Sequence, residues 1–155
     1  MKLGTPFCKK IAIGEFEVNY DPHFTTMMGV FMAAVFYDGS IFVTDLFLGL
    51  SEDAQKFVLY HEEGHAHYDH MNKFSFAKVD KIADVMSLIG YVPRQEAMAD
   101  DFAVKKLGYD KAIRAMKETI DVMSKSKECF SIRDVKLRYR RVLKKGRDYY
   151  DSVQR

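Results

Sequence analysis

The sequence predicts an α+β fold in which a small antiparallel sheet, containing a hairpin, packs on a helical body. Strand-like segments lie within residues 11–45, and amphipathic helical segments follow from residue 51 onward. Strands grouped before helices are typical of the α+β class, because strands that alternate with helices build a parallel sheet instead. At 155 residues, of which 48% are hydrophobic and 30% charged, the chain is expected to form one domain over residues 1–155.

The strands are expected in two regions. Residues 11–18 alternate well enough to predict a first strand. Residues 30–37 and 41–45 are two further β-rich runs, and an Asp-Gly-Ser turn at 38–40 separates them, which is a strong hairpin signal. The second hairpin strand is expected near the start of the next helix, either as an ordinary core strand or as an edge strand that could pair with an extended peptide.

The first long helix is expected over residues 51–68. Ser51 and the two acidic residues after it form a helix start, with a capping hydroxyl and carboxylates near the positive end of the dipole. The apolar stripe that follows includes His61 and His65. A single histidine on such a face usually packs in the core, but two histidines four residues apart lie on one side of a helix. With Glu62 between them they form a His-Glu-x-x-His pattern, which is typical of zinc peptidases.

A second helix carries acidic residues on its inward stripe. It is expected over residues 94–107, and Gly108 suits its C-terminal cap. Glu96 and Asp100 share this stripe with small apolar residues. Two such carboxylates are costly to bury unless a metal ion or a histidine partners them. We therefore expect this helix to supply the second half of the site.

The remaining helices are expected over residues 79–89, over residues 110–124 and from Ser131 to the end of the chain. Ser131 and Asp134 resemble a capping box. The predicted core stripe of the last helix consists of Ile132, Val135, Tyr139, Val142 and Leu143. Residues 131–155 carry nine Lys/Arg against three Asp/Glu. This basic C-terminal helix is either a solvated face, which is the simpler interpretation, or a surface for nucleic acid or another partner.

Bulk properties exclude several classes of protein. No apolar run approaches the ~20 residues that a membrane span requires, and the N-terminus lacks the hydrophobic core of a signal peptide. The two cysteines, Cys8 and Cys129, are far apart and lack the spacing of metal ligands. A reduced, cytoplasmic protein that does not enter a membrane is the simplest interpretation.

A catalytic zinc site requires a third protein ligand beside the two histidines. A metzincin would have Gly at position 68 and His at position 71, where this chain has Tyr68 and Met71. A peptide deformylase would need a cysteine in a Glu-Gly-Cys context, which Cys8 does not provide. What remains is the segment Glu-Ala-Met-Ala-Asp, which begins at Glu96, thirty-one residues after His65.

With these two motifs the chain resembles the gluzincin metallopeptidases, whose third zinc ligand is a glutamate on a later helix, in a Glu-x-x-Ala-Asp or Glu-x-x-x-Asp motif. The continuation over residues 101–110 also looks like the soluble relatives of the membrane-embedded HtpX-type peptidases, and the small minigluzincins are similar in size and layout. The resemblance covers residues 30–125. It implies a zincin-like fold, a Zn²⁺ cofactor and hydrolysis of peptide or protein substrates.

Carried over onto this sequence, the resemblance makes His61, His65 and Glu96 the zinc ligands and Glu62 the general base. Asp100 would orient a ligand histidine through a hydrogen bond. Zinc would polarise the scissile carbonyl and acidify a water, and Glu62 would pass the water's proton to the leaving amine. The tetrahedral oxyanion needs a further donor. The candidates are Arg138, Tyr139, His67, His70 and Tyr91.

Two other interpretations stay open at the level of sequence. In the first, the chain is a non-catalytic or regulatory protein on a zincin scaffold, and its basic C-terminal helix binds a partner or nucleic acid. In the second, the histidine cluster is accidental and no metal binds. We favour the zinc peptidase, because the two motifs occur together and in the right order.

Overall fold

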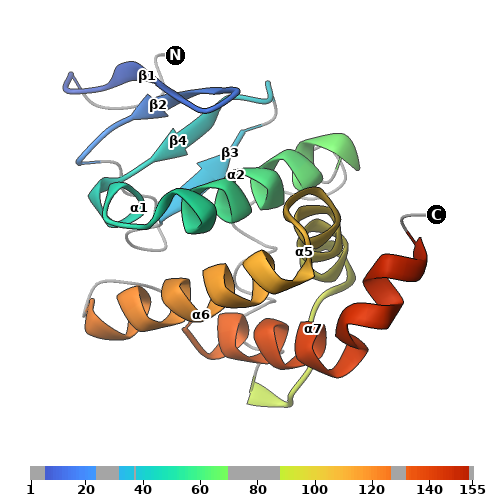
Figure 1. The fold of residues 1–155 in the computed structure, drawn as a ribbon. Helices are drawn as coiled ribbons and strands as arrows, with labels where there is room; N and C mark the ends of the chain where they lie inside the picture. Colours follow the sequence, from blue (N-terminus) through green and yellow to red (C-terminus); the bar gives the residue numbers. More distant parts are fainter. Residues whose placement is uncertain (1–5, 24–31, 37, 70–87, 127–131, 154–155) are drawn as a thin grey trace.

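The computed structural model describes residues 6–23, 32–36, 38–69, 88–126 and 132–153. Within these ranges the strands come first along the chain and are followed by the helices. Figure 1 shows the sheet on one side of helix α2 (Glu52–His67) and the other long helices on its opposite side. The α+β class predicted from the sequence is therefore confirmed.

The sheet has four strands in the order β1-β2-β4-β3. Their bounds are Lys9–Ile13 for β1, Phe16–Tyr20 for β2, Ala33–Val35 for β3 and Ile41–Val43 for β4. The pair β3–β4 is antiparallel, as the predicted hairpin requires, and β1–β2 is antiparallel too, but β2 and β4 pair in parallel, so the sheet is mixed. The reason is the path of the chain, which leaves β2, forms β3 at the outer edge and returns as β4 beside β2.

The first hairpin corrects the prediction of a single strand over residues 11–18. The chain turns at Gly14, and the register pairs Ile13 with Phe16 across the turn. Gly14 has a φ of 57°, which is a left-handed conformation that glycine adopts without strain. The apolar alternation continues through the turn, so periodicity alone did not reveal it.

The second hairpin lies where the Asp-Gly signal predicted it, although its strands are shorter. The Phe36 amide donates to the Ser40 carbonyl at 2.9 Å, and the Gly39 amide donates to the Phe36 carbonyl at 2.8 Å. Because β4 lies between β2 and β3, residues 41–43 form an inner strand, and the edge-strand alternative for this segment is wrong. The edge of the sheet on this side is β3. A one-turn helix, α1 (Asp45–Leu48), then leads toward α2.

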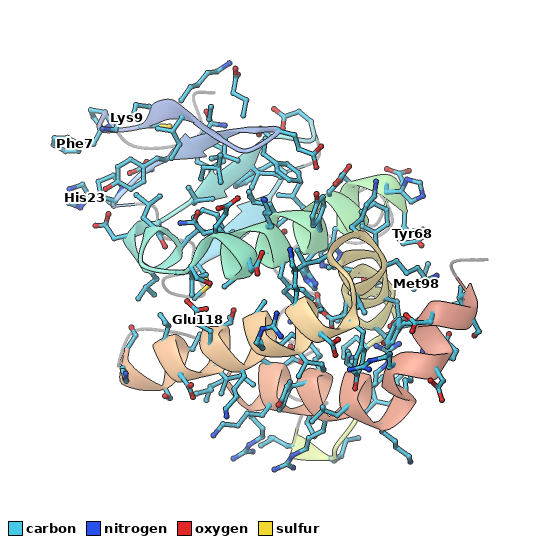
Figure 2. All side chains as sticks on the ribbon, viewed as in Figure 1. Phe7, Lys9, His23, Tyr68, Met98 and Glu118 are labelled. Atoms are coloured by element: carbon cyan, nitrogen blue, oxygen red, sulfur yellow. The ribbon has the colours of Figure 1, made fainter. Side chains whose placement is uncertain are left out.

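Helix α2 begins as the sequence predicted. The Ser51 hydroxyl accepts a hydrogen bond from the Ala54 amide at 3.3 Å. Glu118 of a later helix, α6 (Tyr109–Lys125), in turn accepts from the Ser51 amide at 2.7 Å and from its hydroxyl at 2.6 Å. Figure 2 shows Glu118 on the side of α6 that faces the start of α2. Ser51 therefore both caps the start of α2 and links α2 to α6.

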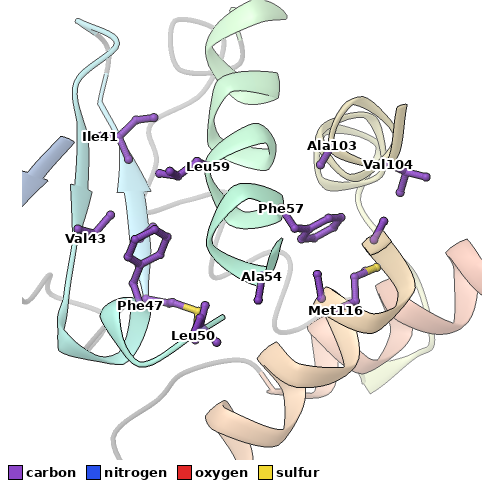
Figure 3. Close-up of a cluster of buried hydrophobic side chains, with 14 of the residues drawn as sticks. Ile41, Val43, Phe47, Leu50, Ala54, Phe57, Leu59, Ala103, Val104 and Met116 are labelled. Carbon is purple, nitrogen blue, oxygen red and sulfur yellow. The ribbon is translucent and has the colours of Figure 1, made fainter. Parts of the chain in front are cut away.

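The core lies on both sides of α2. Figure 3 shows Leu59 directed toward the sheet and Phe57 toward the other helices. Both side chains are buried, at 0% and 4% exposure. The buried residues around them include Ile41, Val43, Phe47, Ala103, Val104 and Met116. Helix α2 is therefore the element on which the sheet and the helical body are both packed.

Two further helices, α5 (Arg94–Leu107) and α7 (Ile132–Val153), lie on either side of α6 along the chain. Helix α5 has the predicted bounds and ends at Gly108, whose φ is 92°. Helix α7 is interrupted at Gly146, where φ is 77° and ψ is 167°. Leu143 was predicted as a core residue but is 42% exposed, whereas Tyr150, beyond the kink, is buried at 1%.

Some predictions fall on residues that the structure does not describe. They include residues 79–87 of the expected short helix, the ends of the strand expected over residues 30–37, the capping residue Ser131, His70 and Cys129. No helix within the described ranges is both long and apolar enough to cross a membrane.

Candidate metal centre

Helix α2 presents His61 and His65 to the interior of the helical body. Residues four apart lie one above the other on a helix, and the two Nε2 atoms are 3.1 Å apart. The rings meet edge to face, with centroids 4.7 Å apart. Both residues are buried, at 7% and 6% exposure. Their nitrogens therefore converge on one point, away from bulk solvent.

Helix α5 brings a carboxylate to the same point. The Glu96 Oε2 atom lies 3.3 Å from His61 Nε2, and its Oε1 atom lies 3.3 Å from His65 Nε2. One ligand atom from each of the three residues fits within a span of 4.8 Å. Two imidazoles and one carboxylate are a donor set that can hold a transition-metal ion. The structure thus brings together the three residues that the sequence predicted as ligands.

Gly64 permits the close approach of α5 to α2. A Cβ atom added at Gly64 would lie 3.0 Å from the Ala99 Cα and 3.1 Å from the Phe102 Cβ. Neither distance leaves room for a side chain. The contact between Gly64 and Ala99 therefore sets how near Glu96 comes to the two histidines. The sequence analysis did not identify Gly64, although a glycine inside a helix, which costs ~1 kcal/mol relative to alanine, is a usable signal.

Asp100 lies directly behind His61. Its Oδ1 atom is 2.8 Å from His61 Nδ1, and the side chain is fully buried. When His61 is neutral and its remaining proton is on Nδ1, donated to the Asp100 carboxylate, the Nε2 lone pair is available to a metal ion. This is the contact that the resemblance implied for Asp100.

Arg138 reaches the site from α7 and holds both carboxylates. Its Nε and Nη2 atoms donate to the two Asp100 oxygens at 2.8 and 2.6 Å, which is the two-pronged geometry that guanidinium groups favour. Its Nη1 atom lies 3.1 Å from Glu96 Oε2. The Arg138 side chain is only 12% exposed. Of the four candidates for the oxyanion donor that the structure describes, Arg138 is the one that contacts the ligand cluster, and it does so beside the carboxylates.

The charges of the cluster stabilise each other. Burial alone would raise the pKa of Asp100, but the Arg138 guanidinium outweighs burial and lowers this pKa to about 2. Burial would also raise the pKa of Glu96, yet His65 and Arg138 hold it well below its usual range. For His61, burial and Arg138 act against protonation, but the hydrogen bonds to Asp100 and Glu96 raise its pKa to about 10. A metal ion must therefore displace a proton from His61 to bind.

Glu62 differs from the other acidic residues of the site. It is 8% exposed, and its Oε2 atom is buried with no hydrogen-bond partner among the described residues. Burial raises its pKa. A buried carboxylate oxygen without a partner is costly, and Glu62 follows His61 directly on α2. The ligand set and this unpartnered oxygen both fit a metal ion with an open position.

The other three candidate donors that the structure describes are His67, Tyr91 and Tyr139. His67 is exposed and packs against the Phe102 ring, with centroids 5.2 Å apart. Tyr91 is 50% exposed, and Tyr139 is half-buried against the hydrophobic core. In the described part of the chain, no hydrogen bond joins these three residues to His61, His65 or Glu96.

Asp134 is a member of the site that the sequence analysis assigned to a helix cap. It is 4% exposed, and its Oδ2 atom lies 3.4 Å from Arg138 Nη1. Its other oxygen has no partner among the described residues. Burial raises the pKa of Asp134 to about 6, against the opposing charge of Arg138. The spacing of four residues between Asp134 and Arg138 was the available signal.

No family model, curated protein or solved structure matches this chain.

Proposed function

We propose that this chain is a zinc-dependent peptidase of the gluzincin type. The observation that supports this proposal is the buried group of His61, His65 and Glu96, together with the buried Glu62 Oε2 atom, which has no hydrogen-bond partner among the described residues. Three protein ligands of these types leave a fourth position open, and an open position distinguishes catalytic zinc sites from structural ones. Peptide or protein substrates are proposed on the sequence resemblance.

His61, His65 and Glu96 would hold the ion. When bound, zinc would supply Lewis acidity that polarises a carbonyl group and makes water more acidic. Two neutral imidazoles and one carboxylate leave a net positive charge on a divalent ion, and this charge favours electrophilic chemistry. The mostly buried position of the ligands excludes bulk water and strengthens these electrostatic effects.

Glu62 would act as the general base. It follows His61 on α2 and is buried, and its Oε2 atom has no hydrogen-bond partner among the described residues. Burial raises the pKa of Glu62 toward neutral pH. A carboxyl group whose pKa is closer to the working pH can both take up a proton and release it again. Glu62 would accept a proton from water and donate it to the leaving amine.

Asp100 and Arg138 would position the ligands. Asp100 holds the Nδ1 side of His61 at 2.8 Å, and Arg138 holds Asp100 by two hydrogen bonds. This chain of contacts fixes the orientation of the imidazole ring. Contacts of this kind behind a metal ligand typically change metal affinity or activity by 10–100-fold when they are removed.

Metal content and hydrolysis, measured on the same samples, test the proposal. The purified chain, loaded with zinc and desalted, is expected to retain about one zinc ion and to cleave a denatured protein substrate. Glu62→Gln should retain the zinc and lose hydrolysis by at least about a hundredfold. Glu96→Gln should lose the zinc itself.

The outcomes separate the alternatives. Zinc bound through Glu96 but no hydrolysis by the wild-type chain would favour the non-catalytic interpretation. Full hydrolysis by Glu62→Gln would remove the role given to Glu62. Failure to bind zinc, with the fold intact by circular dichroism, would overturn the proposal.

A further inference from the structure

The outward face of α7 carries a row of cations. Arg133, Lys136, Arg140 and Lys144 are all exposed, and their spacing of three, four and four residues places them along one side of the helix. We call these four residues the α7 stripe. Figure 2 shows nitrogen-tipped side chains on the side of α7 that faces away from the sheet. At 1.5 Å per residue the stripe is about 16 Å long.

The other basic residues of α7 already have acidic partners. Arg138 pairs with Asp100, and Arg141 and Lys145 pair with Asp101. Arg147, beyond the kink, pairs with Asp110. The stripe, in contrast, forms no ion pair with any carboxylate in the described part of the chain. Between Ile132 and Lys145 the one acidic residue is Asp134, which is buried at the metal centre.

A solvated helix face does not account for charges of a single sign. The neighbouring helix α6 shows the ordinary arrangement, because its exposed residues include Asp110 and Asp121 as well as Arg114 and Lys117. Four unpartnered like charges within about 16 Å repel one another. An anionic partner would relieve this repulsion.

We propose that the α7 stripe binds the phosphate backbone of double-stranded nucleic acid. The duplex carries one negative charge per ~1.7 Å of its axis, so the stripe can contact several phosphates along its whole length. Such contacts carry no sequence information. A helix that lies on a membrane needs an apolar face beside its cations. In this half of α7 the only exposed large hydrophobic residue is Leu143, which favours nucleic acid.

The stripe is independent of the proposed peptidase site. Arg138 faces the metal centre from the buried side of α7, and the stripe occupies the opposite side. Binding of nucleic acid therefore leaves the ligand residues in place. Either proposal can fail while the other holds.

Fluorescence anisotropy with the full chain and a labelled 20-base-pair DNA duplex of mixed sequence tests the proposal. For four phosphate contacts, the plot of log K against log salt concentration should have a slope of about −3.6, so affinity should fall about a hundredfold between 50 and 200 mM salt. Lys136→Glu with Arg140→Glu should weaken binding at 50 mM salt by at least about tenfold and reduce the slope by about half. Lys136→Ala with Arg140→Ala should reduce the slope similarly.

The matched control reverses two exposed lysines at the other end of the molecule, Lys9→Glu with Lys10→Glu, on strand β1 (Figure 1). It changes the net charge equally and should bind like the wild type. Equal losses in the control and stripe variants would show that net charge alone is responsible and would overturn the proposal. The proposal would also be overturned if the wild type did not bind DNA at 50 mM salt. It would be overturned as well if the stripe bound phosphatidylserine vesicles but not DNA.

Discussion

At the scale of single residues, Arg138 and Asp134 show how burial and charge are balanced around the ligands. Arg138 faces the carboxylates of Asp100, Glu96 and Asp134. Its strongest interaction is with Asp100, to which it donates two short hydrogen bonds. Asp134 is the most distant of the three, at 3.4 Å, and it keeps one oxygen unpartnered. Burial therefore dominates the protonation of Asp134, whereas charge dominates that of Asp100.

This difference predicts a specific effect of pH on stability. The folded pKa of Asp134 is about 6, above the ordinary value of 3.8, so the folded state binds its proton more tightly than the unfolded state. The stability contributed by Asp134 is fully present below about pH 4 and is lost as the pH rises through 6. Between pH 4.5 and 7.5 the titration of Asp134 should lower the free energy of unfolding of the wild type by about 2 kcal/mol. The Asp134→Asn variant should lack this decrease.

Urea unfolding of both proteins at the two pH values, with a chelator present, measures this effect. Groups such as His61 and Asp100 titrate in both proteins, so their effects largely cancel in the comparison. An unchanged pH dependence in Asp134→Asn would show that this carboxyl group titrates normally.

At the scale of elements, close contacts between helices position the site. Glu118 of α6 caps the start of α2, and α5 crosses α2 at Gly64. The Glu118 contacts are 2.7 and 2.6 Å long, and a Cβ atom at Gly64 would lie 3.0 Å from the Ala99 Cα. The positions of the ligands therefore depend on the helix packing as much as on the ligands themselves.

Gly64→Ala should disturb this packing. The added Cβ atom would meet the Ala99 backbone at 3.0 Å, so α5 must move by some tenths of an ångström and carry Glu96 with it. Overpacking costs 1–3 kcal/mol, and the better helix propensity of alanine offsets about 1 kcal/mol. We expect a net loss of about 1 kcal/mol in the free energy of unfolding and about tenfold weaker zinc binding.

Urea unfolding and competition with a zinc-binding dye measure the two effects. Ala66→Val is the control, because Ala66 lies on the exposed side of the same helix. It should change stability slightly and leave zinc affinity unaltered. Zinc binding by Gly64→Ala that equals the wild type would mean that the contact between Gly64 and Ala99 does not set the site geometry.

At the scale of the whole molecule, the proposed metal ion would join α2 to α5, and Arg138 would connect both to α7. An ion that binds only the folded state stabilises it by RT ln(1 + [L]/Kd), or about 2.7 kcal/mol at a hundredfold excess over Kd. For a chain of this size, zinc should raise Tm by about 5–10 °C. Glu96→Gln should abolish most of this increase.

Differential scanning fluorimetry with and without zinc, after removal of metals by a chelator, provides the measurement. An equal rise in Tm for wild type and Glu96→Gln would place the stabilising ion elsewhere. No rise in the wild type would argue against a folded metal site.

The parts of this molecule that were predictable from sequence are those that local patterns determine. The His-Glu-x-x-His turn of α2, the acidic stripe of α5 and the Asp-Gly hairpin each lie within a few residues of chain. The parallel pairing of β2 with β4 and the contact of Arg138 with Asp100 join segments that local periodicity does not relate. Gly14 was missed because apolar alternation continued across its turn, and Gly64 because its importance depends on what packs against it.

The position of Arg138 along the chain also has a consequence for biosynthesis. The ribosome adds all three proposed ligands, and Asp100, before it reaches residue 138. At 5–20 residues per second, the thirty-eight residues between Asp100 and Arg138 take about 2–8 s to synthesise. Throughout that interval the nascent chain holds Glu96 and Asp100 without the cation that later balances them. The proposed metal centre is therefore completed from its C-terminal side, after its proposed ligands have been made.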